Sequence, residues 1–282
     1  MNTSDYVERV SFVAEDVGRL SYRDIRETVA AHGLALVRGL FDRGKLGQSL
    51  ARIREQFDAG RDERHDPRDT DRIRRNFQKL QIGANSGVNS RRTLGRFMRV
   101  FYNPIFEPDI YGLREHFVRL AEIRNLLYEL PIDFAVHGTD EGCWTCSRIQ
   151  QYPAGGGFMV PHRDMYSQVA ANDKGLGYYQ VLLQLTQKGV DFDEGGAYVD
   201  LEEDRLAYEE HCRTGDVIVY DGRSVHGVAD IDPMKPLDLQ RFNGRAVLLA
   251  SLFRVLAPGG HEYAEMAERA RARYGVEPEA NS

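Results

Sequence analysis

The sequence is poor in cysteine, with three in 282 residues. An odd number of cysteines and the lack of a signal segment are typical of a reducing compartment, so we expect a cytoplasmic protein without a disulfide framework. Cys143 and Cys146 have the spacing of half a zinc site, but Cys212 stands alone and no second pair completes it. We therefore do not expect a structural zinc site.

Long apolar runs and an excess of basic residues are also missing. No segment approaches the length that is needed to cross a bilayer. The formal net charge is −6, whereas proteins that bind nucleic acid generally present a basic surface. We expect neither a membrane nor a nucleic-acid partner.

The composition is that of an ordinary globular protein, with 42% hydrophobic and 28% charged residues. There is no internal repeat, low-complexity tract or convincing linker, and we expect one domain over residues 1–282. A chain of this length can bury a core without a structural metal. Any metal that it binds is therefore expected to take part in chemistry.

Residues 1–145 are predicted to form mainly helical support and a lid. Helices are expected at residues 21–32, 44–57 and 108–130, and a buried strand at 34–40. Ser21 is a suitable N-cap and Gly33 a suitable stop for the first helix. Arg124 is expected on the solvent face of the last helix, opposite its apolar face. The polar, glycine-bearing residues 83–90 are typical of a mobile lid.

The second half alternates short β-branched and aromatic segments with glycine-bearing turns. Strands are expected at residues 146–152, 177–185, 196–201, 217–220 and 245–255. This density of strands after a helical half predicts an α+β protein with a sandwich or barrel backed by helices. The working β core is expected at residues 146–256, and one further helix at residues 257–282.

Three residues form a candidate metal site. His162 and Asp164 stand at positions i and i+2 after a glycine-rich turn, so in extended backbone their side chains point to the same side. His226 follows a predicted strand and turn that could bring it beside them. Two histidines and one carboxylate are the facial triad of non-haem iron(II) oxygenases, which leaves the opposite face of the metal open.

A family resemblance extends this site. The stretch Tyr-Pro-Ala-Gly-Gly-Gly-Phe-Met-Val-Pro-His-Arg-Asp at residues 152–164 resembles the first metal-binding strand of Fe(II)/2-oxoglutarate dioxygenases. The glycine pair at 195–196, Gly215-Asp216-Val217, His226 and Arg245 follow in the family's order. The resemblance covers roughly residues 146–255, and residues 33–41 are similar to the start of phytanoyl-CoA-hydroxylase-like members.

The resemblance implies a double-stranded β-helix, or jelly roll, with helices outside one sheet. It implies that His162, Asp164 and His226 bind Fe(II), that 2-oxoglutarate and O2 are cosubstrates, and that succinate and CO2 are released. In the family an arginine at the start of the last core strand binds the distal carboxylate of 2-oxoglutarate, and Arg245 fits this position. It lies farther beyond His226 than is usual, so Arg241 remains an alternative.

Further cosubstrate contacts are expected from the strands. Tyr152 stands where relatives similar to prolyl hydroxylases place a tyrosine on the cosubstrate, although a purely structural tyrosine is equally compatible with the sequence. Gln150 and Gln180 are further candidates, because polar side chains that point into a barrel usually form hydrogen bonds there.

The resemblance leaves the reaction open. Hydroxylation of an unactivated C–H bond in a small molecule, such as an amino acid or a natural-product intermediate, is expected. The same cofactors also support desaturation, epimerisation or ring formation, whereas Asp164 argues against halogenation because halogenases of this type lack the carboxylate ligand. A non-redox cupin-like metal-binding protein and a metal-dependent hydrolase are alternatives of other classes.

Overall fold

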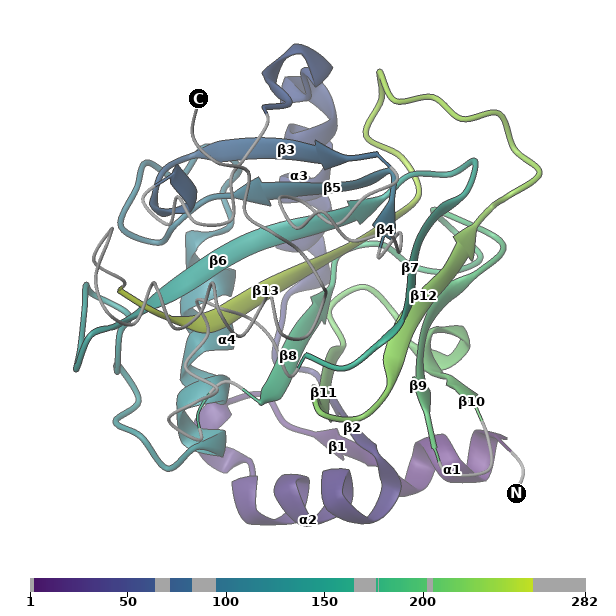
Figure 1. The fold of residues 1–282 in the computed structure, drawn as a ribbon. Helices are drawn as coiled ribbons and strands as arrows, with labels where there is room; N and C mark the ends of the chain where they lie inside the picture. The colour runs from purple at the N-terminus through teal and green to yellow at the C-terminus, as the bar shows by residue number, and fades with distance from the viewer. Residues whose placement is uncertain are drawn as a thin grey trace, which may run out of the picture.

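Two β-sheets packed face to face form the centre of the protein (Figure 1). The computed structural model describes residues 3–63, 72–82, 95–164, 176, 178–201 and 205–255. Their strands are β1 (Ser11–Val13), β2 (Leu34–Arg38), β3 (Phe77–Gln81), β4 (Gly95–Arg96), β5 (Met98–Tyr102), β6 (Cys143–Tyr152), β7 (Gly157–His162), β8 (Tyr179–Gln184), β9 (Gly196–Asp200), β10 (Arg205–Ala207), β11 (Val217–Asp221), β12 (His226–Ile231) and β13 (Arg245–Arg254).

The strand order defines a large sheet and a small sheet. Among the described residues, the large sheet runs β1-β2-β11-β8-β13-β6-β5-β3 and the small sheet runs β10-β9-β12-β7-β4. Every described neighbouring pair is antiparallel except the parallel pair β1–β2. This arrangement of antiparallel strands in two facing sheets is the predicted jelly roll.

Helices cover the outer face of the large sheet. The helices are α1 (Thr3–Arg9), α2 (Tyr22–His32), α3 (Arg43–Gln56) and α4 (Arg114–Leu127), with short 3₁₀ helices η1 (Val17–Arg19), η2 (Ala59–Arg61), η3 (Arg72–Arg74) and η5 (Tyr208–His211). Apolar residues of α2, α3 and α4 pack with the outward residues of β2, β6, β8, β11 and β13 in one core. In Figure 1, α4 runs behind β6 and β13. The second core fills the space between the two sheets.

Strand alternation decides which side chains face that interior. On β6, Ile149 belongs to the helix-side core, whereas Trp144 and Tyr152 belong to the core between the sheets. On β13, Leu248 is the register partner of Ile149 and shares its side, and Val247 faces inward. Even-numbered residues of β6 and odd-numbered residues of β13 therefore line the interior.

The predicted elements are largely confirmed. Helix α2 begins after Ser21, whose hydroxyl accepts a hydrogen bond from the Asp24 amide, and ends at Gly33 in the left-handed region with a φ of 85°. The strands expected in the second half appear as β6, β8, β9, β11 and β13. Residues 1–145, predicted to be mainly helical, also contain β1–β5. The predicted lid at 83–90 and the helix at 257–282 lie outside the described residues.

The predicted exposure of Arg124 is wrong. Its side chain is 1% exposed and its guanidinium donates to the backbone carbonyls of Ala250 and Phe134 and to the side chain of Asn125. The helix therefore buries a cation that links it to β13, because these acceptors replace its lost hydration. Helix α4 begins at Arg114, several residues later than the predicted start.

The described helices include none with both the length and the apolar character of a membrane span.

Candidate functional site

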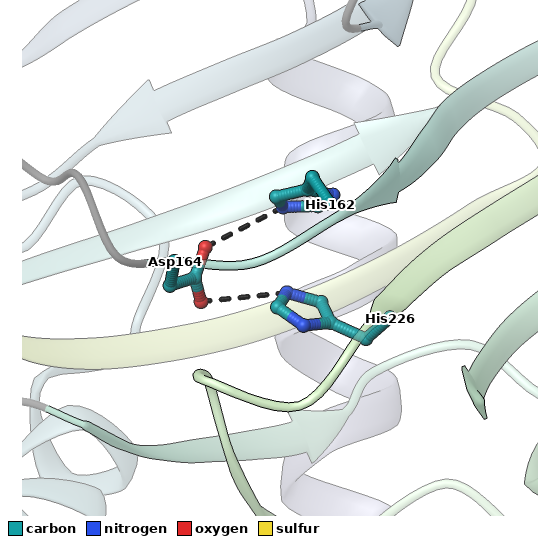
Figure 2. A group of neighbouring side chains, drawn as sticks. All are labelled: His162, Asp164 and His226. Carbon is teal, nitrogen blue, oxygen red and sulfur yellow. Dashed lines mark ion pairs between the residues drawn. The ribbon is translucent and has the colours of Figure 1, made fainter. Parts of the chain in front are cut away.

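The three predicted metal ligands come together at one end of the two-sheet interior (Figure 2). His162 is the last residue of β7, Asp164 follows it by two residues, and His226 is the first residue of β12. His226 and His162 are direct partners in the antiparallel register of β12 and β7. The two imidazoles therefore sit side by side, with their ring centroids 4.3 Å apart.

Asp164 lies between the two rings. Its Oδ1 is 3.4 Å from His162 Nε2, and its Oδ2 is 3.4 Å from His226 Nε2. One ligand atom from each of the three residues lies within 4.8 Å of the others, so the group could hold a metal ion. Two imidazole nitrogens and a carboxylate form a donor set that suits iron(II) and other divalent transition metals.

The other nitrogen of each ring fixes its tautomer. His162 Nδ1 is 2.9 Å from the carbonyl oxygen of Val160, and His226 Nδ1 is 2.9 Å from that of Ser224. A carbonyl oxygen only accepts, so both Nδ1 atoms carry hydrogen and the Nε2 atoms face Asp164. Each Nε2 donates to the carboxylate when it is protonated and offers its lone pair to a metal when it is not. Metal-binding histidines in proteins commonly have this backing hydrogen bond.

The electrostatics keep the carboxylate ionised. Burial raises the pKa of Asp164, but hydrogen bonds from His162 and His226 outweigh it and hold the pKa well below its usual value. Burial lowers the pKa of His162, and Asp164 more than reverses this, so the net direction is upward. The protons that the rings share with Asp164 are those that a bound cation would displace.

Gly222 forms the wall behind Asp164. Its carbonyl accepts a hydrogen bond of 2.7 Å from the Asp164 amide. A Cβ atom at this position would lie 2.9 Å from Asp164 Oδ2. A glycine is therefore needed here to leave room for the carboxylate.

Arg245 already has a carboxylate partner. It is buried at the start of β13, and its guanidinium contacts both oxygens of Glu209 at 2.6–3.0 Å. Glu209, on η5, also accepts hydrogen bonds from Gln184 Nε2 and from the Ala197 amide. To bind the distal carboxylate of 2-oxoglutarate, Arg245 would have to share its guanidinium with Glu209 or exchange Glu209 for it.

The other predicted cosubstrate residues have different surroundings. Arg241 has an 83% exposed side chain and lies 3.5 Å from Asp238. Tyr152 is buried beside Arg245, which lies 5.2 Å from the centre of its ring, and burial raises the pKa of its hydroxyl to about 12. Gln150 and Gln180 are half-buried on inward positions of β6 and β8.

Residues that the sequence did not predict also face the interior. Glu209 is one, and no local pattern marks it. Arg148 is another. Strand alternation puts it on the same side of β6 as Gln150 and Tyr152, so the sequence could have predicted that it faces inward. Lys79 lies on β3, a strand that was not predicted.

Comparison with known proteins gives a likeness in structure only. No protein-family model and no curated protein matches the sequence. A prolyl hydroxylase from Trichoplax adhaerens, solved with a peptide fragment of a hypoxia inducible factor oxygen degradation domain, superposes with a TM-score of 0.51 at 12% identity, covering 89% of this chain and 91% of that chain.

Two bacterial structures are also similar. A Pseudomonas putida prolyl-4-hydroxylase gives a TM-score of 0.49 at 14% identity, covering 84% of this chain and 100% of that chain. An oxidoreductase of the 2OG-Fe(II) oxygenase family from Burkholderia pseudomallei gives 0.43 at 13% identity, covering 87% and 94%. At such identities the likeness to the Trichoplax enzyme shows the fold alone, and the chain has the jelly-roll fold of that prolyl hydroxylase.

Proposed function

We propose that the protein is a non-haem iron(II)- and 2-oxoglutarate-dependent dioxygenase that hydroxylates an unactivated C–H bond of a small molecule in the cytoplasm. The observation that carries the proposal is the meeting of His162, Asp164 and His226 at one end of the jelly roll. An amino acid or a natural-product intermediate is the proposed substrate, and succinate and CO2 are the proposed co-products.

The residues of the site would bind and orient the metal. The two Nε2 atoms and the Asp164 carboxylate would occupy one face of its coordination sphere, which leaves the other face for ligands. When bound, iron(II) would couple the oxidation of 2-oxoglutarate by O2 to that of the substrate. The carbonyls of Val160 and Ser224 hold the imidazoles in the orientation that this requires.

Neighbouring side chains would shield and position the ligands. The ring of Tyr220 lies 4.8 Å from that of His226, centre to centre, and restricts water on that side. Tyr152, Gln150 and Gln180 are proposed to contact the cosubstrate, because β6 and β8 place them on interior positions.

The first experiment is an oxygen-free titration of metal-free protein with iron(II) and then 2-oxoglutarate. We expect the weak visible charge-transfer band of chelated 2-oxoglutarate in the wild type and its loss in His162→Ala. The control is His137→Ala, since His137 is exposed and outside the triad. Well-folded, iron-loaded protein without the band would rule out the proposed cofactor chemistry.

A second measurement separates the remaining reaction classes. With oxygen admitted, the proposal requires succinate release that depends on O2. Turnover of a substrate without oxygen or 2-oxoglutarate would instead indicate a metal-dependent hydrolase, in which metal-bound water is the nucleophile.

A further inference from the structure

Arg148 faces the interior between the two sheets, and none of the described carboxylates pairs with it. It shares the inward parity of Trp144 and Tyr152 on β6, and its register partners are Leu249 on β13 and Tyr102 on β5. Its guanidinium lies 3.8 Å from the Sγ of Cys146 and 5.4 Å from the centre of the Phe253 ring. Across the described ranges, no aspartate or glutamate forms an ion pair with it.

A second cation lies beside Arg148. Lys79 on β3 is 7% exposed, and its Nζ lies 5.6 Å from the centre of the Tyr102 ring. Burial, followed by the nearby charge of Arg148, lowers the pKa of Lys79 to about 8. Two neighbouring cationic groups give this part of the interior a positive potential, which favours the binding of an anion.

Some of the other buried or half-buried arginines have a carboxylate beside them, whereas buried Arg124 donates to backbone carbonyls and to Asn125. Arg245 is paired with Glu209, and Arg38 lies 3.5 Å from Asp216. A carboxylate that enters the interior therefore finds Arg245 already neutralised, whereas Arg148 still presents an uncompensated guanidinium. A guanidinium can bind a carboxylate through two parallel hydrogen bonds.

Arg148 is also near the metal ligands. It shares the inward face of β6 with Tyr152, whose hydroxyl lies 3.9 Å from the Sδ of Met159 on β7, the strand that ends at His162. A small molecule that reaches the triad can therefore come within range of Arg148.

We propose that Arg148, with Lys79 beside it, binds the carboxylate group of a small organic acid inside the jelly roll. The identity of that acid rests on the proposed function: the carboxylate is either the distal group of 2-oxoglutarate or that of the substrate. The chemistry of recognition is the same in both cases.

The chain contains its own reporter for this site. Trp144 is the single tryptophan, it is buried, and its ring centre lies 5.7 Å from that of Phe253. Phe253 also contacts Arg148. A carboxylate that binds to Arg148 should therefore change the fluorescence of Trp144.

The first arm uses metal-free protein and glutarate as the probe, so it does not depend on the metal site. We expect saturable quenching or a spectral shift in the wild type, binding about 10- to 100-fold weaker in Arg148→Met, and partial recovery in Arg148→Lys. The controls are Arg241→Met, which removes an exposed arginine, and Arg245→Met combined with Glu209→Gln, which removes the internal ion pair without leaving a charge. Both should bind glutarate within about threefold of wild type, a difference of about 0.7 kcal/mol.

The second arm uses oxygen-free, Mn(II)-loaded protein and compares 2-oxoglutarate with 2-oxovalerate, which has a methyl group in place of the distal carboxylate. If the preference for 2-oxoglutarate collapses in Arg148→Met, the site binds the cosubstrate. If the preference persists while glutarate binding is lost, the site binds the substrate's carboxylate. Failure of Mn(II) to bind would contradict the proposed function and leave the inference about Arg148 to be decided by the glutarate measurements.

The inference is overturned if folded wild type and Arg148→Met bind glutarate equally, or if the wild type does not bind it. It is also overturned if glutarate binding is lost in the Arg245→Met/Glu209→Gln control and kept in Arg148→Met. Circular dichroism and the unfolding midpoint identify variants that are misfolded. Arg148→Lys keeps the test decisive should Arg148→Met not fold.

Discussion

Arg245 and Glu209 form a buried ion pair in which Arg245 Nη2 lies 2.6 Å from Glu209 Oε1 and Nε lies 2.8 and 3.0 Å from the two carboxylate oxygens. The pair joins the start of β13 to η5, across 36 residues of sequence. Both side chains are almost completely removed from water. Each charge is therefore tolerated only because the other is present.

Breaking the pair on one side should be far more harmful than removing it. We expect Arg245→Met to lower the free energy of unfolding by roughly 3–5 kcal/mol, because it leaves the Glu209 carboxylate buried and unpaired. Arg245→Met combined with Glu209→Gln should stay within about 2 kcal/mol of wild type, since no charge is left behind. Urea unfolding at pH 7 measures both. A double variant that is as unstable as the single one would contradict this explanation.

The pair should also give the stability a defined dependence on pH. Burial raises the pKa of Glu209, but the charge and hydrogen bonds of Arg245 outweigh it, so the pKa in the folded state lies below the usual 4.5. The stabilisation is then complete above about pH 4.5 and is lost as the pH falls through the lower pKa of the folded state. As the pH falls below 4.5, the wild type should lose stability relative to the neutral double variant. A constant difference from pH 3 to pH 7 would be inconsistent with an ionised Glu209.

Lys79 should act in the opposite direction. Its pKa in the folded state is lowered to about 8, so below that pH the fold must accommodate a buried ammonium. We expect Lys79→Met to be more stable than wild type by up to about 3 kcal/mol at pH 6. The advantage should decline as the pH rises from 8 toward 10.5 and the wild-type amine becomes neutral in both states. Urea unfolding at several pH values measures this, and an advantage that grows with pH would refute it.

The room around Asp164 should be essential for metal binding. Gly222→Ala would place a methyl group 2.9 Å from Asp164 Oδ2. We expect a loss of at least about 10-fold in Mn(II) or Fe(II) affinity while the fold persists, since displaced ligand geometry typically has this effect. Gly47→Ala is the matched control, because a Cβ there meets nothing within 4 Å. It lies within α3 and should raise stability by about 0.5–1 kcal/mol. Equal metal affinity in both variants would show that Asp164 can move aside.

The sequence predicted the β core and the clustering of His162, Asp164 and His226 because their signals are local. Alternation and glycine turns mark β6, β8, β9, β11 and β13 within a few residues each. His162 and Asp164 are close in the sequence, and His226 follows a recognisable strand. These signals do not depend on the rest of the chain.

The missed features depend on distant partners. Strands β3 and β5 carry polar side chains such as Lys79 and Arg99 among their apolar ones, which hides the alternation, and they form because each pairs with a neighbour in the large sheet. The burial of Glu209 could not be predicted without its ion-pair partner Arg245, which is distant in the sequence. Arg124 resembles a surface residue until β13 supplies the carbonyl that accepts its hydrogen bond.

The direct register partnership of His162 and His226 has a consequence for folding. Side chains alternate along a strand, so a slip of one residue between β7 and β12 would turn one imidazole to the opposite side of the sheet. Only the correctly paired strands present all three ligands together. A divalent cation that binds only to the native pairing would stabilise it by mass action relative to pairings shifted by one residue.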